Sequence, residues 1–296
     1  MLQDALLTGV AAGTCIDKEE LGETTMQTIC EVEEFLGPTH LQAQILRSDD
    51  GRPVRPIING RQRKWTGKYF CLKAGAQSMP WESRKCELPL LKLAEASSAV
   101  VALLAQPHCL RMTLEGKRFD YYPDLELTVL PSFLKAYHDG ASFCRALVGW
   151  APATAAEMRY AKVIVEAKDD SDRRMADPEY LLKLDLAKQA YRNLGFHMVT
   201  VMRSTDLDPL DFADLHSVLR FRLARFTAVD EIGAVSLLRD AAHVSLLDVC
   251  DALGGWRRGR AKAYALHCRR LISIDLATSL SAFTRVRPMP REISLS

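Results

Sequence analysis

The clearest hydrophobic pattern in the chain is the apolar run Val163 to Val165, which lies within the stretch 161–169 and is followed by charged residues. Three β-branched residues in a row predict a strand that enters a protein core, and strand side chains alternate between two faces. Glu166 and Lys168 therefore point to the same side of the sheet. Burying a carboxylate and an ammonium at the end of a core strand costs free energy of desolvation, which favours a functional role for this pair. The alternative is an exposed charged pair at a strand end.

The same spacing of Glu and Lys occurs at Glu115 and Lys117. Here Gly116 lies between the two charges, and apolar residues alternate with polar ones on both sides. That pattern predicts the turn of a β-hairpin over 108–122 instead of a buried pair.

The segments around the central strand alternate between helical and strand patterns. Apolar spacing predicts a helix within 78–101, where Pro89 has to lie in the first turn or at a kink. Capping residues predict a second helix from Asp177 to Gly195. Strands are predicted over 124–130 and 196–202, with an excursion over 131–160 between two neighbouring strands. This order predicts a small α/β core with a mixed sheet.

The two ends of the chain differ from this core. Residues 1–48 are predicted to be helical, with no candidate chemistry. Beyond Asp206 the pattern predicts a helical region over 212–229, a capped helix ended by Gly254, a helix over about 260–270 and a strand over 271–276. Helix, glycine turn, helix and strand are typical of a winged helix-turn-helix.

Composition limits the classes of function. The chain has 296 residues, 48% hydrophobic and 26% charged, which is typical of a globular protein with room for two domains. We find neither an apolar run of about 18 residues nor a signal segment, and therefore expect a cytoplasmic protein without a membrane partner. The eight cysteines form no Cys-x-x-Cys pair, which argues against a zinc site and predicts free, mostly buried thiols.

The net charge of +2 gives no global attraction to nucleic acid, so that DNA contacts have to come from local basic clusters. The first cluster lies in 49–73, where basic residues mix with aromatic ones; the alternative is a solvated loop. The second cluster lies in 257–270, which contains no acid; the alternatives are a solvated face or a surface that docks a partner. The DNA-binding candidates are Arg61, Arg63, Lys64, Arg257, Arg258, Arg260, Lys262, Arg269 and Arg270.

The predicted order of elements suggests metal-assisted hydrolysis of a phosphodiester. Asp124 and Glu166, at the ends of neighbouring strands, can hold a hard cation such as Mg²⁺ or Mn²⁺ between them. Glu87, on the packed helix, completes the cluster, and Lys168 orients the attacking water or offsets charge on the phosphate. Taken singly, Asp124 can be a turn residue after proline and Glu87 an exposed helical acid.

The chain has a motif order that resembles the PD-(D/E)xK nuclease superfamily: Glu87, then Pro123 and Asp124, then Glu166 and Lys168. More closely, the segment 81–87, WESRKCE, and the later Gln106-Pro107 resemble the TnsA family, the endonuclease subunit of heteromeric cut-and-paste transposases. The resemblance covers roughly 61–205. It implies that Glu87, Asp124 and Glu166 are the metal ligands and that Lys168 is the catalytic lysine.

The resemblance also implies a fold and a set of partners. We expect an N-terminal extension over 1–60, a restriction-endonuclease-like mixed-sheet core over 61–205 and a mostly helical, winged-helix-like domain over 206–296. The expected activity is a metal-dependent cut of the 5′ strand of double-stranded DNA at transposon ends, with a DDE transposase and an AAA+ ATPase as partners. The alternatives are another PD-(D/E)xK nuclease, of the restriction or repair type, and an inactive DNA-binding assembly protein.

Overall fold

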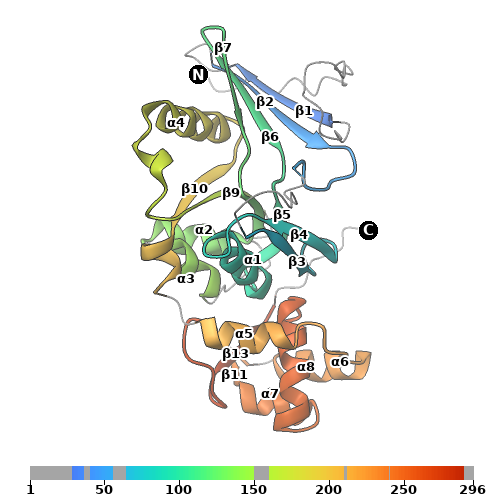
Figure 1. The fold of residues 1–296 in the computed structure, drawn as a ribbon. Coiled ribbons are helices and arrows are strands. Elements are labelled where there is room, and N and C mark those ends of the chain that lie inside the picture. Colours follow the sequence, from blue (N-terminus) through green and yellow to red (C-terminus); the bar gives the residue numbers. More distant parts are fainter. Residues whose placement is uncertain are drawn as a thin grey trace, which may run out of the picture.

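The structure, a computed structural model, is a mixed α/β protein and describes residues 29–36, 41–55, 65–149, 160–209, 212–239 and 241–289 (Figure 1). The strands are β1 (Ile29–Leu36), β2 (Gln42–Ser48), β3 (Gly67–Cys71), β4 (Gln77–Trp81), β5 (Val100–Ala105), β6 (Cys109–Leu114), β7 (Lys117–Tyr121), β8 (Leu125–Val129), β9 (Ala161–Lys168), β10 (His197–Met202), β11 (Val244–Ser245), β12 (Ile272–Ile274) and β13 (Arg285–Pro288). The α-helices are α1 (Glu87–Ala96), α2 (Pro131–His138), α3 (Phe143–Val148), α4 (Pro178–Asn193), α5 (Phe212–Arg220), α6 (Ala228–Leu237), α7 (Leu246–Ala252) and α8 (Trp256–Cys268).

The central sheet has the strand order β10-β9-β8-β5. β10 runs parallel to β9, while β8 is antiparallel to both β9 and β5, so that the sheet is mixed. Val163 and Val165 are buried in the core cluster that also contains α1, α2 and α3, whereas Ile164 is buried in the cluster on the other face, with α4, β2, β6 and β7. The prediction of a strand that enters the core is therefore confirmed, and the structure adds that this strand is buried on both faces.

α4 begins and ends where the sequence predicts, whereas the helical pattern predicted within 78–101 is shorter in the structure, because β4 covers its first residues and β5 its last. The side chain of Asp177 accepts a hydrogen bond from the Glu179 amide at the start of α4, and Gly195, with φ +81°, follows its end. α1 begins at Glu87, which places Pro89 in the first turn, where its missing amide hydrogen removes no helical bond. The excursion between β8 and β9 contains α2 and α3.

The second sheet, with the order β1-β2-β6-β7, corrects the prediction that 1–48 is helical. Within the described part of that segment, β1 and β2 are strands. In β2 the buried Ala43 and Ile45 alternate with more exposed residues, which is the period of a strand. β2 pairs with β6, and the β6-β7 hairpin turns at Glu115 and Gly116, both with positive φ, as predicted for this second Glu-x-Lys.

The C-terminal part combines α5 to α8 with the small antiparallel sheet β11-β13-β12. The predicted helical region 212–229 is interrupted: α5 ends at Arg220, and α6 starts after Thr227, which forms a capping box with Asp230. α8 begins at Trp256, directly after two glycines with positive φ, and thus earlier than predicted. β12 is shorter than the strand predicted over 271–276.

The C-terminal part shares one apolar core with α1 and the central sheet. α8 and α5 both contact α1, as Figure 1 shows. At this contact the buried His267 places its Nε2 2.7 Å from the Ala96 carbonyl oxygen and accepts at Nδ1 from the Ile274 amide, 3.0 Å away. Burial lowers the pKa of His267 to about 3, so that the ring stays neutral and its Nε2 carries the donated proton.

Buried thiols and helix lengths agree with the composition. The cysteines whose side chains are described are free and buried, as expected for Cys71, Cys86, Cys109, Cys144, Cys250 and Cys268. Within the described ranges, no helix has the length and apolar character needed to cross a membrane.

Gly259 gives a test of the contact between α7 and α8. A Cβ added at this position would lie 1.9 Å from the Cys250 carbonyl oxygen, and backbone cannot yield cheaply. We expect Gly259→Ala to lower the free energy of unfolding by about 1–3 kcal/mol. The control is Gly233→Ala in α6, where a Cβ meets nothing within 4 Å and the helix gains up to about 1 kcal/mol. Urea denaturation measures both; equal effects would contradict the packing.

Candidate active site

The four predicted site residues come from three elements that meet at one end of the central sheet. Glu87 is the first residue of α1, Asp124 directly precedes β8, and Glu166 and Lys168 lie at the end of β9. β8 and β9 are antiparallel with Leu125 opposite Val165, so that Asp124 comes to lie beside Glu166. The Ala167 amide donates to Asp124 Oδ2 at 2.8 Å, which fixes this carboxylate against β9.

The start of α1 is held by the residues of the predicted motif. The side chain of Ser83 accepts a hydrogen bond from the Cys86 amide at 3.1 Å. The Glu82 amide donates to Glu87 Oε2 at 2.9 Å. The Ser83 side chain therefore holds the turn that leads into α1, and the Glu82 amide positions the first carboxylate of this helix.

Glu166 and Lys168 form a buried pair with two tyrosines. Lys168 Nζ lies 2.5 Å from Glu166 Oε1, and the two side chains are only 1% and 6% exposed. The Tyr180 hydroxyl donates to the same oxygen at 3.0 Å, and the Tyr121 hydroxyl donates to Oε2 at 2.5 Å. Asp172 Oδ2 lies 3.5 Å from the ammonium. The pair is thus buried and satisfied by hydrogen bonds, contrary to the alternative of an exposed pair.

The electrostatics show that the carboxylates act on one another. Burial raises the pKa of Glu87 to about 7, and the charges of Glu82 and Glu166 add to this effect. Burial raises the pKa of Asp124 well above its ordinary range, and the charges of Glu166 and Glu87 raise it further. Like charges close together disfavour ionisation. Glu87, Asp124 and Glu166 are therefore close enough to form one acidic cluster.

Lys168 carries its charge in this cluster. Burial by itself lowers the pKa of the ammonium, but Glu166 and the Tyr180 hydroxyl outweigh burial and raise it. The side chain is therefore a hydrogen-bond donor at neutral pH, with no capacity to accept a proton. This one cation does not balance the three acids, since Glu87 and Asp124 keep raised pKa values beside it.

The donor set suits a hard divalent cation. All three candidate ligands offer carboxylate oxygens; among the residues that the structure describes, the hydrogen bonds of Glu87 and Asp124 use Oε2 and Oδ2, and leave Glu87 Oε1 and Asp124 Oδ1 to face a cation. In the present side-chain arrangement, no three acids, histidines or cysteines within the described ranges are close enough to hold a metal ion. Both oxygens of Glu166 are engaged, Oε1 by Lys168 and Tyr180 and Oε2 by Tyr121. A bound cation requires Glu166 to exchange some of these contacts.

Two tyrosines and an aspartate of the site are absent from the sequence-based prediction. Tyr121 stands two residues before Pro123, in the motif that identified Asp124, and this proximity was the available signal. Tyr180 belongs to the apolar spacing of the helix predicted from Asp177 to Gly195, and spacing alone gives no sign of a role for the hydroxyl. Asp172 accepts from the Arg174 amide at the start of a 3₁₀ helix and lies near Lys168 only through the fold.

The predicted basic clusters are only partly accessible. Arg61, Arg63 and Lys64 lie outside the described residues. Arg257 and Arg258 are exposed at the start of α8. Lys262, in contrast, forms an ion pair with Asp230 at 2.6 Å, which fixes α8 to α6. Four of the six candidates in 257–270 contact their own chain, Lys262 and the three arginines described next.

The remaining arginines of this cluster contact backbone or aromatic rings. Arg269 donates to the Ala224 carbonyl oxygen at 3.2 Å, and Arg270 Nε donates to the Ser98 carbonyl oxygen at 3.2 Å. Arg260 stacks on the Trp256 ring, 5.4 Å from its centroid. The second basic cluster is therefore not one continuous DNA-binding face.

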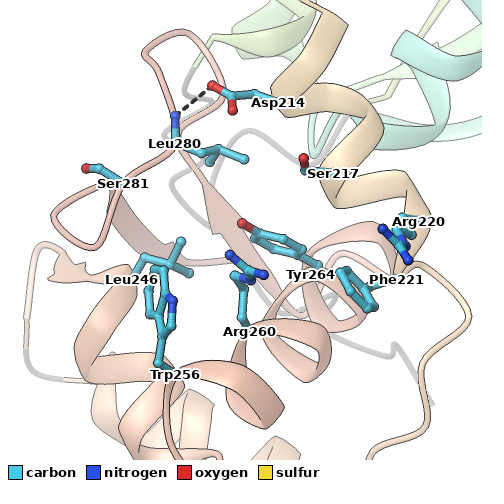
Figure 2. A pocket seen from close by; sticks show the side chains of 10 residues that line it. All are labelled: Asp214, Ser217, Arg220, Phe221, Leu246, Trp256, Arg260, Tyr264, Leu280 and Ser281. Atoms are coloured by element: carbon cyan, nitrogen blue, oxygen red, sulfur yellow. Dashed lines mark hydrogen bonds between the residues drawn. The ribbon is translucent and has the colours of Figure 1, made fainter.

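A hollow of about 200 Å³ lies between α5, α7 and α8. Figure 2 shows the guanidinium of Arg260 and the hydroxyl of Tyr264 among the side chains that line it. At its rim, Asp214 accepts a hydrogen bond from the Leu280 amide at 2.7 Å. None of the four predicted site residues lines this hollow. The acidic cluster is therefore a separate site on the central sheet.

No known family model matches the chain, and no curated protein matches it either. A function for this chain therefore has to be inferred from the geometry of the acidic cluster and from the motifs around it.

Stability should depend on pH and on divalent cations through Glu87. Because its pKa rises from 4.5 to about 7, the neutral carboxyl favours folding. This stabilisation is complete below pH 4.5 and is lost as pH rises through 7; it amounts to on the order of 3 kcal/mol. In EDTA, we expect the melting temperature to fall across this range, and Mg²⁺ at pH 8 to restore it.

Glu87→Gln should flatten the profile and reduce the effect of Mg²⁺. The matched control is Glu115→Gln in the hairpin turn, where neither should change. Differential scanning fluorimetry at several pH values measures these shifts. A profile of Glu87→Gln that coincides with that of the unmodified protein would contradict the cluster.

Proposed function

We propose that the chain is a metal-dependent endonuclease that hydrolyses phosphodiester bonds in DNA. The observation that carries this proposal is the meeting of Glu87, Asp124 and Glu166 beside the buried ammonium of Lys168. Three oxygen ligands at the edge of a sheet suit Mg²⁺ or Mn²⁺, which keep waters for a substrate phosphate. The raised pKa values of two of these acids support a site that a cation would complete.

The order of elements supports a restriction-endonuclease-like core. The elements of this core come in the chain order α1, β5, β8, β9, α4 and β10, with the β6-β7 hairpin inserted between β5 and β8, and α2 and α3 between β8 and β9. The helix supplies the first carboxylate and the two central strands supply the others. A fold of this kind can host several nucleases, so that the choice among them rests on the motifs.

Each residue has a defined part in the proposed reaction. Glu87, Asp124 and Glu166 would hold the cation, which supplies a bound water of lowered pKa and offsets charge on the phosphate. Lys168 donates hydrogen bonds to the attacking water or to a phosphate oxygen, since its raised pKa keeps it charged. The buried position of Lys168 holds this donor in place before substrate arrives.

The TnsA-like motifs favour a particular DNA substrate and particular partners. By this resemblance, the enzyme cuts the 5′ strand at transposon ends, in the cytoplasm, together with a DDE transposase and an AAA+ ATPase. The C-terminal part supports a role in DNA binding, because α6, β11, α7, α8, β12 and β13 follow the order of a winged helix. Arg257 and Arg258 are its exposed basic residues at the start of α8.

Nicking of transposon-end DNA tests the proposal. With Mg²⁺ or Mn²⁺ and the partner transposase, we expect Asp124→Ala and Lys168→Ala to lower the rate at least about 100-fold. Lys117→Ala is the control: it removes the lysine of the other Glu-x-Lys, which pairs at the surface with Glu179 at 2.9 Å. Its rate should be unchanged. Equal rates in all four proteins would exclude catalysis at this cluster.

Duplex DNA binding tests the C-terminal part separately. The double variant Arg257→Ala, Arg258→Ala should bind DNA more weakly, and its salt dependence should fall by roughly one unit of slope for each lost phosphate contact. Lys262→Ala is the control, because that ammonium already pairs with Asp230; it should cost up to about 1 kcal/mol of stability and leave the slope unchanged. Fluorescence anisotropy at several salt concentrations distinguishes the two cases, and an identical slope in the double variant would contradict DNA contact through α8.

A further inference from the structure

The hydroxyl of Tyr180 lies between the two charged groups of the Glu-x-Lys strand. It accepts a hydrogen bond from Lys168 Nζ and donates one to Glu166 Oε1 at 3.0 Å. The ammonium also lies 4.8 Å from the centre of the Tyr180 ring. One side chain of α4 therefore contacts Lys168 through its hydroxyl, with the edge of its ring nearby.

Cation binding at Glu166 changes which groups hold the Lys168 ammonium in place. The ammonium is 1% exposed and pairs directly with Glu166 Oε1 at 2.5 Å. In the proposed function, the Glu166 carboxylate binds a cation, and its ion pair with Lys168 becomes weaker. A buried ammonium without partners is strongly disfavoured. Another group has to hold Lys168 in the loaded site.

We propose that Tyr180 is a positioning residue that keeps Lys168 aimed at the reacting phosphate when Glu166 binds a cation. This inference rests on the proposed function. Tyr180 retains its hydrogen-bond acceptor for the ammonium whatever Glu166 does. The second neighbour, Asp172, is 3.5 Å away and already binds Arg174 at 2.7 Å, so that it is the weaker support.

The local fold gives Tyr180 this place. Asp177 caps α4 and Pro178 begins it, which puts Tyr180 in the first turn, directly above the end of β9. Glu166 has a separate anchor, since the Tyr121 hydroxyl donates to its Oε2 at 2.5 Å. Removing the Tyr180 hydroxyl therefore leaves Glu166 held and affects chiefly the lysine.

The kinetic test uses Tyr180→Phe, which keeps the ring and removes the hydroxyl. We expect kcat for nicking to fall roughly 10- to 100-fold, while the Mg²⁺ concentration for half-maximal rate changes by less than about threefold. In a Lys168→Ala background the same substitution should have no further effect. The matched control is Tyr191→Phe on the same helix, whose hydroxyl lies 2.7 Å from His108 Nε2, outside the cluster; its kcat should stay unchanged.

A second readout is independent of activity. Ammonium protons of a buried, hydrogen-bonded lysine exchange slowly with water, so that ¹⁵N-lysine NMR can follow Lys168. In the unmodified protein, Mg²⁺ should shift the Lys168 signal and leave it sharp. In Tyr180→Phe the signal should be sharp without Mg²⁺, when Glu166 holds the amine, and be lost to exchange with Mg²⁺.

The outcomes separate the two claims. An equally sharp Lys168 signal with Mg²⁺ in Tyr180→Phe, or an unchanged kcat, overturns the positioning role and leaves the nuclease proposal standing. A fall in kcat that persists in the Lys168→Ala background also overturns it, because the effect then bypasses the lysine. A Lys168 signal that does not respond to Mg²⁺ in the unmodified protein overturns the proposed function, and this inference with it.

Discussion

The main electrostatic constraint on this structure is that the fold brings several carboxylates together at one end of its central sheet, where they repel one another. Burial first raises the pKa of Glu87 and of Asp124; the charge of Glu166 raises both further, and the charge of Glu87 also raises that of Asp124. Burial increases this cost, since charge in a protein interior is poorly solvated. If these acids had no function, apolar residues could stand in their place with little loss of stability. In the proposed function, the surrounding contacts hold the acids in place for a cation.

Those contacts extend well beyond the cluster. Glu87 depends on the start of α1, and the far end of this helix is tied to the rest of the chain. The Lys73 ammonium donates to the Ala94 and Ser97 carbonyl oxygens there, and His267 of α8 binds Ala96. Glu95 accepts from the amides of the segment that follows β3. The C-terminal part is thus packed against the helix that supplies the first carboxylate, and the two share one apolar core.

The sequence predicts the elements whose signals are local. The β-branched run predicts β9, the aspartate and proline predict the start of α4, and the glycines predict the turn before α8. The strands β1 and β2 escape such reasoning, because β2 pairs with β6, distant in the chain, and β1 pairs only with β2. The role of Tyr180 escapes it too, since helical spacing reports burial of a ring and says nothing about its hydroxyl. Likewise, a basic run cannot reveal that Lys262 is paired with Asp230.

Diffraction from crystals soaked in Mn²⁺ tests the central claim most directly, because manganese gives an anomalous signal that locates the ion independently of side-chain fitting. The account predicts a peak bounded by carboxylate oxygens of Glu87, Asp124 and Glu166, at about 2.0–2.3 Å as expected for a hard cation, with Lys168 beside it. A peak elsewhere, or none between these three acids at saturating Mn²⁺, would contradict the account.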